Sequence, residues 1–313
     1  MRKSRSPFLN VCYTALFLLL TFCILTRSRL SLQYAATGLE LWYHNMIPTL
    51  LPFMILSGTL IRMGLTEGFT TLVYPFVGPL FRVSRNVCYV MIMGFMCGFP
   101  MGAKCVSDLY ARGGIDRREA SYLLAFCNNI GPVYFVSFAL PLIGCRRPIP
   151  CLIGMYGLPL LYGLWLRYTS FRDLSRQGDS RRPPKPGATA PPLKLLYALD
   201  ESIRSSLQSM LMLGGYMILF NLLMLLPHLL TGGPARFVAP ILEITGGLKL
   251  LEDRMPVYSL ILLPFGGLSC IAQTYTCIRD TDLAIGEYVR HKLILTGLSA
   301  VYYLFCLRFL RLL

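Results

Sequence analysis

Apolar residues come in long runs, interrupted at a few places by clusters of glycine, proline and polar residues. The runs are close to the roughly 20 residues that an α-helix needs to cross the hydrocarbon core of a bilayer. They predict membrane segments at Phe8–Leu25, Met46–Leu65, Val87–Tyr110, Tyr122–Leu142, Ile149–Leu166, Ser209–Leu230, Val257–Ile278 and Leu293–Leu313. The pattern therefore predicts an all-α, polytopic helical membrane protein.

Composition supports a membrane protein and argues against a soluble one. The 313 residues are 55% hydrophobic and 14% charged, with a mean hydropathy of +0.56, whereas soluble domains carry about 25% charged residues. The net charge of +15 comes from Lys and Arg in short loops and tails, where they anchor to anionic lipid and set topology. We therefore expect a multi-pass protein of the cytoplasmic membrane that does not bind nucleic acid.

A basic, proline-rich stretch at 167–196 is typical of an extended linker and divides the chain. We expect an N-terminal membrane anchor at 1–30, a first repeat at 31–166, this linker, and a second repeat at 197–313. The basic start followed by an apolar run also fits a signal peptide. No small-residue cleavage site follows at the expected distance, so an uncleaved anchor is the better interpretation.

Three blocks of the first half resemble three blocks of the second half, in the same order and at nearly one offset. They are LLPFMILSG (50–58) with LGGYMILFN (213–221), VGPLFRV (77–83) with VAPILEI (238–244), and GFPMGAKCVSDL (98–109) with GLSCIAQTYTCI (267–278). Internal repeats are typical of transporters. The pairing sets Lys104 opposite Gln273, Ser107 opposite Thr276, and Arg82 opposite Glu243. Whether the repeats are parallel or inverted stays open.

The most informative interruption contains Gly98, Pro100 and Gly102, followed by Lys104. Non-helical backbone at membrane depth is tolerated only where it is buried in protein or lines a cavity. A lysine at a new helix N-terminus places two positive charges together, so a negative group is expected nearby. Asp108, one turn on, is one candidate. The other is an anionic ligand, which Ser107 on the same short helix would also contact.

Three further interruptions carry polar groups. Asn128, Asn129 and Gly131 follow one apolar run, and their amides suit either a polar ligand or an interhelical hydrogen bond. Another interruption holds Gly266, Gly267, Ser269 and Gln273, with Ser269 expected to cap the next helix. Glu243 lies in a mostly apolar stretch. We expect it to form a structural ion pair with Arg82 or Lys104, the alternative being a site for a coupling proton or ion.

The stretch GFPMGAKCVSDLYARGGIDRREASYLLAFCNNIGPVYF resembles the nucleoside-recognition (gate) domain family, in particular the YlbJ-type sporulation integral membrane proteins. EITGGLKLL and PFGGLSCIAQ in the second half are similar to the same proteins. The resemblance covers roughly residues 40–310. It implies an inner-membrane or forespore-membrane protein with a transport-type fold, and it implies dipicolinate, a small aromatic dicarboxylate, as cargo.

The leading hypothesis is thus a permease for a small anionic aromatic metabolite, bound near Lys104, Asn128, Asn129 and Gln273. A nucleoside transporter and a non-transporting scaffold of a spore-envelope complex are the alternatives. We expect no enzyme, because the sequence holds no nucleophile–base pair or catalytic motif. We expect no cofactor or metal either, since the eleven cysteines form no CxxC pair and the three histidines are scattered. Homo-oligomerisation stays open.

Overall fold

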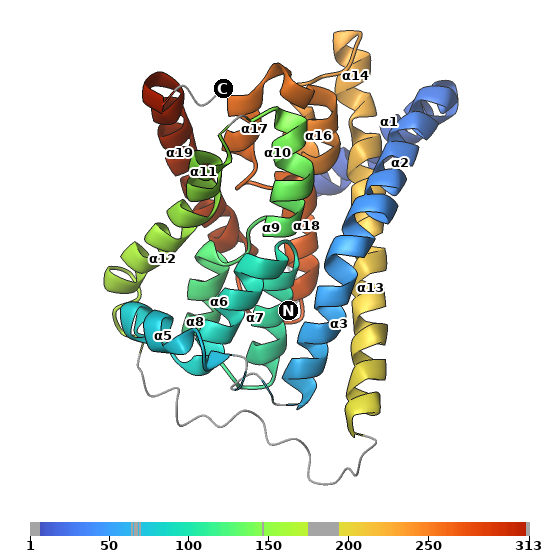
Figure 1. The fold of residues 1–313 in the computed structure, drawn as a ribbon. Helices are drawn as coiled ribbons and strands as arrows, with labels where there is room; N and C mark the ends of the chain where they lie inside the picture. Colours follow the sequence, from blue (N-terminus) through green and yellow to red (C-terminus); the bar gives the residue numbers. More distant parts are fainter. Residues whose placement is uncertain are drawn as a thin grey trace.

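The computed structural model describes residues 7–63, 65, 68, 70–145, 147–174 and 194–310. Every regular element in these ranges is a helix, which confirms the predicted all-α class (Figure 1). Most of the predicted linker at 167–196 lies outside the described residues.

Two very long helices stand side by side along one flank of the molecule (Figure 1). The first runs from Ser28 to Met63 and is built from α2 (Ser28–Leu41), the π-helical turn η1 (Trp42–Met46) and α3 (Ile47–Met63). The second is built from α13 (Lys194–Leu223) and α14 (Leu225–Thr231). The chain runs in opposite directions along the two. The segments predicted at 46–65 and 209–230 are therefore the apolar ends of longer helices.

Small residues let these two helices approach closely. A Cβ on Gly38 would lie 2.8 Å from the backbone oxygen of Met217, and one on Gly214 would lie 2.6 Å from the Trp42 ring. The Trp42 indole donates a hydrogen bond of 2.9 Å to the backbone oxygen of Met210. Close packing through glycine is how helices associate where no hydrophobic effect drives them together.

The first predicted interruption forms the tip of a helical hairpin. After α1 (Pro7–Thr26) and the long helix comes α5 (Tyr74–Phe81), which meets α6 (Arg85–Cys97) at 106°. The helix α7 (Met101–Ala111) then returns alongside α6. The segment predicted as one span at 87–110 is thus two antiparallel helices that turn back at 98–100.

The next part of the chain crosses the molecule in two pieces. Asp116 and Glu119 form a capping box that starts α8 (Arg117–Phe126), since each side chain accepts from the other's backbone N–H at 2.8 Å. After the interruption at 127–131 the chain continues in helical turns, α9 (Pro132–Tyr134), η2 (Phe135–Ala139) and α10 (Leu140–Ile143). A crossing helix follows, made of α11 (Pro148–Leu152), η3 (Ile153–Gly157) and α12 (Leu158–Tyr168).

The second half repeats the use of short, broken helices. The elements are α15 (Ala239–Leu242), α16 (Ile244–Leu251), η5 (Glu252–Arg254), α17 (Pro256–Leu262), α18 (Gly267–Ile278) and α19 (Ile285–Leu310). The tight contact between α15 and α16 depends on Gly247, where a Cβ would lie 2.3 Å from the Pro240 nitrogen. These two helices form a second, shorter hairpin that approaches the centre from the end opposite to the α6–α7 hairpin (Figure 1).

Within the described ranges, four helices are long and apolar enough to span a membrane, or five if the bent pair α5–α6 is counted. The protein is therefore an integral membrane protein with several spans, as predicted. The two-repeat organisation and its orientation stay predictions.

Candidate functional site

The first two interruptions touch each other backbone to backbone. Gly98 has a positive φ of 82°, and a Cβ there would lie 2.2 Å from the backbone nitrogen of Gly131. A Cβ on Gly102 would lie 2.7 Å from the carbonyl oxygen of Cys127. Only glycine fits these positions, because any side chain would push the hairpin tip off the end of α8.

The other two interruptions join the same place. The Phe99 ring, at the hairpin tip, packs over Gly266, where a Cβ would lie 3.0 Å from the ring. The neighbouring Gly267 has a φ of 79°, and a Cβ on it would lie 3.1 Å from the backbone nitrogen of Ile244. Four helix interruptions, far apart in the sequence, therefore converge at one point in the protein interior.

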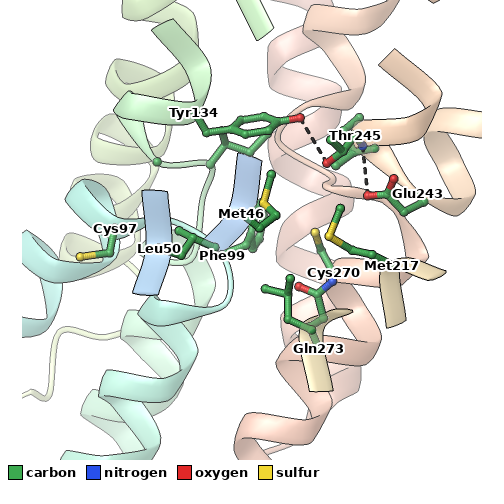
Figure 2. Close-up of a pocket in the computed structure, with 14 residues that line it drawn as sticks. Met46, Leu50, Cys97, Phe99, Tyr134, Met217, Glu243, Thr245, Cys270 and Gln273 are labelled. Atoms are coloured by element: carbon green, nitrogen blue, oxygen red, sulfur yellow. Dashed lines mark hydrogen bonds between the residues drawn. The ribbon is translucent and has the colours of Figure 1, made fainter. Parts of the chain in front are cut away.

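A small central cavity of about 50 Å³ lies where they converge (Figure 2). Met46 and Leu50 of the first long helix and Met217 of the second form apolar parts of its wall. Phe99 and Tyr134 add aromatic parts. A buried water needs about 10–15 Å³ of such volume. The cavity thus has room for a few waters and none for an aromatic ring.

A larger, polar cavity of about 290 Å³ lies beside the central one, between α7, α13 and α18. We call it the vestibule. Lys104 and Asp108 lie in its wall as an ion pair of 3.6 Å, with 18% and 31% of their side chains exposed. This confirms the predicted Lys104–Asp108 contact. Hydroxyl and amide groups form much of the remaining polar lining: Ser107, Ser205, Gln208, Ser209, Tyr216, Gln273 and Thr276.

Gln273 and Leu213 line both cavities and so separate them. The Gln273 amide donates a hydrogen bond of 2.9 Å to the Ser269 hydroxyl one turn earlier on α18. The expectation that Ser269 caps this helix is wrong, because Gly266 occupies the N-cap position and no side chain caps the helix there.

Glu243 is the acidic residue of the central cavity, and it caps a helix. It is 2% exposed, and its carboxylate accepts hydrogen bonds from the backbone N–H of Thr245 (3.1 Å) and Gly246 (2.6 Å), at the start of α16. The amide of Asn221 donates a third bond of 3.1 Å. The positive end of α16 thus compensates the carboxylate, together with three N–H donors. Tyr134 joins the cluster through a bond of 3.2 Å from its hydroxyl to that of Thr245 (Figure 2).

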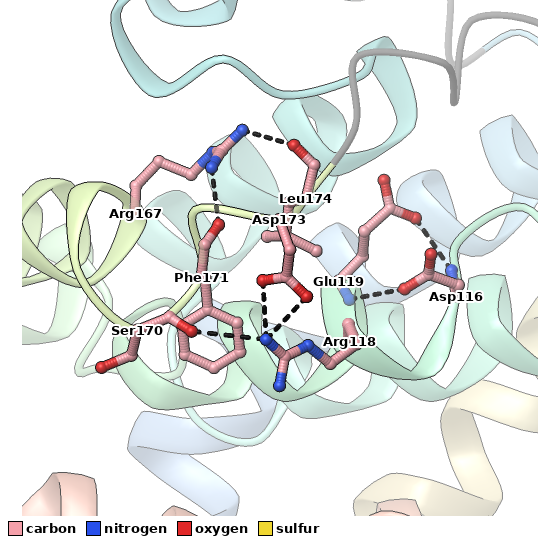
Figure 3. A network of polar contacts seen from close by, with 8 residues as sticks. All are labelled: Asp116, Arg118, Glu119, Arg167, Ser170, Phe171, Asp173 and Leu174. Carbon is pink, nitrogen blue, oxygen red and sulfur yellow. Dashed lines mark hydrogen bonds and ion pairs between the residues drawn. The ribbon is translucent and has the colours of Figure 1, made fainter.

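The predicted ion pair of Glu243 with Arg82 or Lys104 is therefore wrong. Arg82 ends α5 in a left-handed conformation, and its guanidinium lies over the Tyr168 ring, 5.0 Å from the centroid. Its backbone oxygen accepts a hydrogen bond of 2.9 Å from Arg167. That region is a separate polar network at the end of α12, which includes Arg118 and Asp173 (Figure 3).

Asn128 connects three helices rather than lining either cavity. Its side-chain oxygen accepts from the backbone N–H of Ala103 at the start of α7 (3.2 Å). Its NH₂ group donates to the hydroxyls of Thr274 on α18 (2.9 Å) and Tyr288 on α19 (3.1 Å). The neighbouring Asn129 is fully buried as well. The ligand-binding role predicted for both amides stays a prediction, whereas their structural hydrogen bonds are now explicit.

Lys292, on α19, is a site residue that the sequence prediction did not include. It is 0% exposed, and its ammonium donates to the backbone oxygen of Asn128 and to the side-chain oxygen of Asn129 (3.0 Å). The ammonium also lies over the rings of Phe99 (4.6 Å from the centroid) and Tyr288 (5.6 Å). It therefore links the α6–α7 hairpin tip to the end of α8. In the sequence Lys292 directly precedes the predicted span 293–313, where a lysine is normally interfacial.

Apart from Arg82, which lies in the separate network, the predicted site residues fall into three groups. Pro100, Lys104, Ser107, Asp108 and Gln273 line the vestibule, and Gly131, Glu243 and Gln273 line the central cavity. Seven others line neither cavity but build the junction around them: Gly98, Gly102, Asn128, Asn129, Gly266, Gly267 and Ser269. Phe99, Tyr134 and the polar face of α13 are lining residues that the prediction missed, because single aromatic and polar residues give no distinct signal within an apolar helix.

Comparison with known proteins gives a relative along nearly the whole chain. The chain is 28% identical, over 328 aligned residues, to the "Sporulation integral membrane protein YlbJ" of Bacillus subtilis (strain 168), which covers 91% of this chain and 80% of that protein. No family model and no solved structure matches the chain. The sequence motifs, the membrane-spanning helices and this similarity together support a relationship of the chain to YlbJ-type sporulation integral membrane proteins.

Proposed function

We propose that the protein is a permease that moves a small anionic aromatic metabolite, of the dipicolinate type, across a membrane during spore formation. The observation that carries the proposal is the vestibule with Lys104 in its wall, which stops at Gln273 and Leu213 against a much smaller central cavity. Binding sites where broken helices meet are the recurring arrangement in secondary transporters.

The vestibule has the chemistry to hold a carboxylate. The Lys104 ammonium supplies a charge, and hydroxyls such as those of Ser107 and Thr276 supply hydrogen-bond donors around it. Asp108 holds the ammonium in this structure at 3.6 Å, which is an ion pair longer than a direct hydrogen bond. An incoming carboxylate would therefore compete with Asp108 for Lys104, and the volume of about 290 Å³ suits a single-ring acid.

The small volume of the central cavity, about 50 Å³, supports a transport cycle rather than a fixed channel. Because it holds only a few waters, the cargo can pass only if the two hairpin tips separate. Each tip is short and is held by close backbone contacts, as at Gly98 and Gly247. If the tip of the α6–α7 hairpin and the tip of the α15–α16 hairpin moved away one at a time, the cargo would be exposed first to one side of the membrane and then to the other. That sequence is alternating access. The proposal involves no chemical change to the cargo.

Two observations bear on the alternatives. The amides of Asn128 and Asn129, which suggested a nucleoside base, already bond to protein groups, so they favour an anion in the vestibule over a nucleoside. The relative is named for sporulation and for its membrane location, and its name gives no cargo. A scaffold without transport activity is the outcome that the experiment below would reveal.

The test is uptake of radiolabelled dipicolinate into vesicles that contain the purified protein, with empty vesicles as background. We expect saturable uptake that related aromatic acids inhibit and nucleosides do not. Lys104→Gln should raise the KM about tenfold, because a charge-assisted hydrogen bond contributes about 1.5–3 kcal/mol.

Lys249→Gln is the matched control. Lys249 forms an ion pair of 3.7 Å with Glu40, away from both cavities, so its loss removes the same charge without touching the vestibule. Equal effects of the two variants would remove Lys104 from the site. No uptake of any acid or nucleoside by folded protein would contradict the permease and favour the scaffold.

A further inference from the structure

The ammonium of Lys292 occupies a place that a coupling cation would suit. In broken-helix transporters, cations bind to the oxygen atoms that a helix leaves free at its C-terminal end. Here α8 ends at Phe126, and the backbone oxygen of Asn128, two residues on, accepts from Lys292 together with the amide oxygen of Asn129. The ring faces of Phe99 and Tyr288 complete the surroundings, as they do in other cation–π sites.

No carboxylate forms an ion pair with Lys292 in the described part of the chain. The titratable groups that face it from packed elements are the Cys127 thiol at the end of α8 and the Cys270 thiol on α18. The Tyr288 phenol lies on α19, the same helix as Lys292.

Two further groups lie close by but have other partners. His291, next to Lys292 in the sequence, forms a hydrogen bond of 2.6 Å with Tyr162 of α12. Glu243, the acid that lines the central cavity together with Cys270, is held by the start of α16.

Phe99 controls access to this ammonium. The Lys292 nitrogen lies over its ring, 4.6 Å from the centroid. Phe99 also lines the central cavity (Figure 2). Lys292 itself lines neither cavity and is 0% exposed. Movement of the α6–α7 hairpin tip, which would take Phe99 with it, would uncover this nitrogen to water. Exchange of a proton at Lys292 is thus tied to the same movement that would open the central cavity.

From this geometry we infer that Lys292 is the proton-binding site that couples transport, and that its ammonium replaces a diffusible metal cation. The inference rests on the proposed permease. With the proton bound, Nζ carries a positive charge and holds the hairpin tip to the end of α8. When the tip opens, the proton leaves to water, the nitrogen keeps its lone pair, and the neutral amine no longer holds the two oxygen atoms together as strongly. Rebinding of a proton from the other side completes the cycle.

The experiment measures accumulation of radiolabelled dipicolinate in vesicles under an imposed pH or sodium gradient. Exchange of labelled for unlabelled dipicolinate, measured without a gradient, reports transport that needs no driving force. For one proton per solute, a gradient of about one pH unit, in one of its two orientations, should raise wild-type accumulation up to about tenfold. A sodium gradient should have no effect. Lys292→Arg keeps a positive charge but cannot lose its proton. Lys292→Met has no group that can bind a proton. Both should lose the response to pH while solute exchange remains measurable.

Lys104→Gln serves as the comparison, since it should weaken uptake and leave the ratio of accumulation with and without the pH gradient unchanged. If wild-type protein exchanges solute but responds to sodium instead of pH, the inference is wrong and the permease stands. If Lys292→Arg still accumulates solute about tenfold under the pH gradient, the inference is also wrong. If wild-type protein exchanges no solute, both proposals fail. Should neither variant at Lys292 fold, the two gradients on wild-type protein still decide.

Discussion

Lys104 and Lys292 lie near the same junction of helix interruptions but are stabilised in different ways. Lys104 lies in the vestibule wall, partly exposed, with a carboxylate at 3.6 Å as its partner. Lys292 is fully buried and is held by a backbone oxygen, an amide oxygen and two aromatic rings. The first environment leaves the cation able to change partner, whereas the second fixes it in place.

The interior of the protein and its rim differ in the same way, in how charged side chains are stabilised. Arg167, 4% exposed, donates to four backbone oxygens at the ends of α5 and α12, and Glu243 accepts from the start of α16. At the rim, Arg118 pairs with Asp173 at 2.6 Å, with more than half of each side chain exposed (Figure 3). Helix ends compensate interior charges, which suits a membrane protein because the partial charges of a helix end require no second buried ion.

The largest expected effect is on stability and concerns Lys292. Replacing it by methionine leaves two buried oxygen atoms without a donor, at about 1–3 kcal/mol for each. We therefore expect Lys292→Met to lower the free energy of unfolding by about 2–5 kcal/mol. Lys104→Met should lower it by about 1 kcal/mol, since the ion pair with Asp108 is partly exposed. Thermal or denaturant unfolding in detergent measures both. Similar losses for the two variants would contradict the division between the interior and the vestibule.

Glycines offer a second comparison of interior and rim. Gly98 and Gly113 have similar positive φ values of 82° and 71°, but a Cβ on Gly98 would meet the Gly131 backbone and one on Gly113 would meet nothing within 4 Å. Gly113→Ala should cost only the backbone strain, about 1–2 kcal/mol. Gly98→Ala adds the steric clash, so we expect a loss of about 3 kcal/mol or more.

Unfolding measurements on the two glycine variants provide the check. If Gly98→Ala proved no less stable than Gly113→Ala, the contact between the first two interruptions would be looser than described, and the hairpin tip would not depend on it.

A smaller effect is expected on ligand affinity. Asp108→Asn removes the carboxylate that competes for Lys104, so an anionic cargo should bind up to about fivefold more tightly, in line with about 1 kcal/mol for a partly exposed ion pair. Asp200→Asn breaks the exposed pair with Arg204 and serves as the control. Titration calorimetry with dipicolinate measures both. Weaker binding by Asp108→Asn would show that Asp108 orients the lysine instead of competing with the cargo.

The smallest effect belongs to the rim pair of Arg118 and Asp173. The hydrogen bond from Arg118 holds the pKa of the Asp173 carboxyl below its ordinary value. A lowered pKa contributes stability above the ordinary carboxyl value of about 3.9, and this contribution is lost as the pH falls through the lower value in the folded protein. Melting temperatures of wild type and Asp173→Asn should thus differ slightly at neutral pH and converge in acid. A difference in melting temperature that grew as the pH fell would contradict the lowered pKa of Asp173.

The sequence predicted the interruptions well and their geometry poorly. Gly98, Pro100 and Gly102 mark the end of one helix and the start of another, but the same residues fit a kinked span and a hairpin, and only packing against Gly131 decides for the hairpin. Glu243 in an apolar stretch indicated a buried partner for its charge. The sequence does not tell whether that partner is a cation or the N-terminal end of a helix, and in the structure it is the start of α16.

Lys292 shows the other limit of the sequence. A lysine at the border of an apolar run is normally interfacial, because its long side chain reaches the headgroups. Here α19 begins at Ile285, two turns earlier, so Lys292 is carried into the interior. Its polar partners, Asn128 and Asn129, lie more than 160 positions away in the sequence. Contacts at that separation leave no local pattern.

The paired long helices have a consequence for the bilayer around the protein. The helix from Ser28 to Met63 has 36 residues and is therefore about 54 Å long, against a hydrocarbon core of about 30 Å. A tilt of about 40°, at the upper end of what membrane helices show, still leaves a vertical extent of about 41 Å. Both long helices therefore extend beyond the hydrocarbon core into the headgroup layers, which together with the core measure about 40–45 Å, unless the surrounding lipid thickens. The thickness of the membrane should then affect how tightly the two long helices pack against the two hairpins.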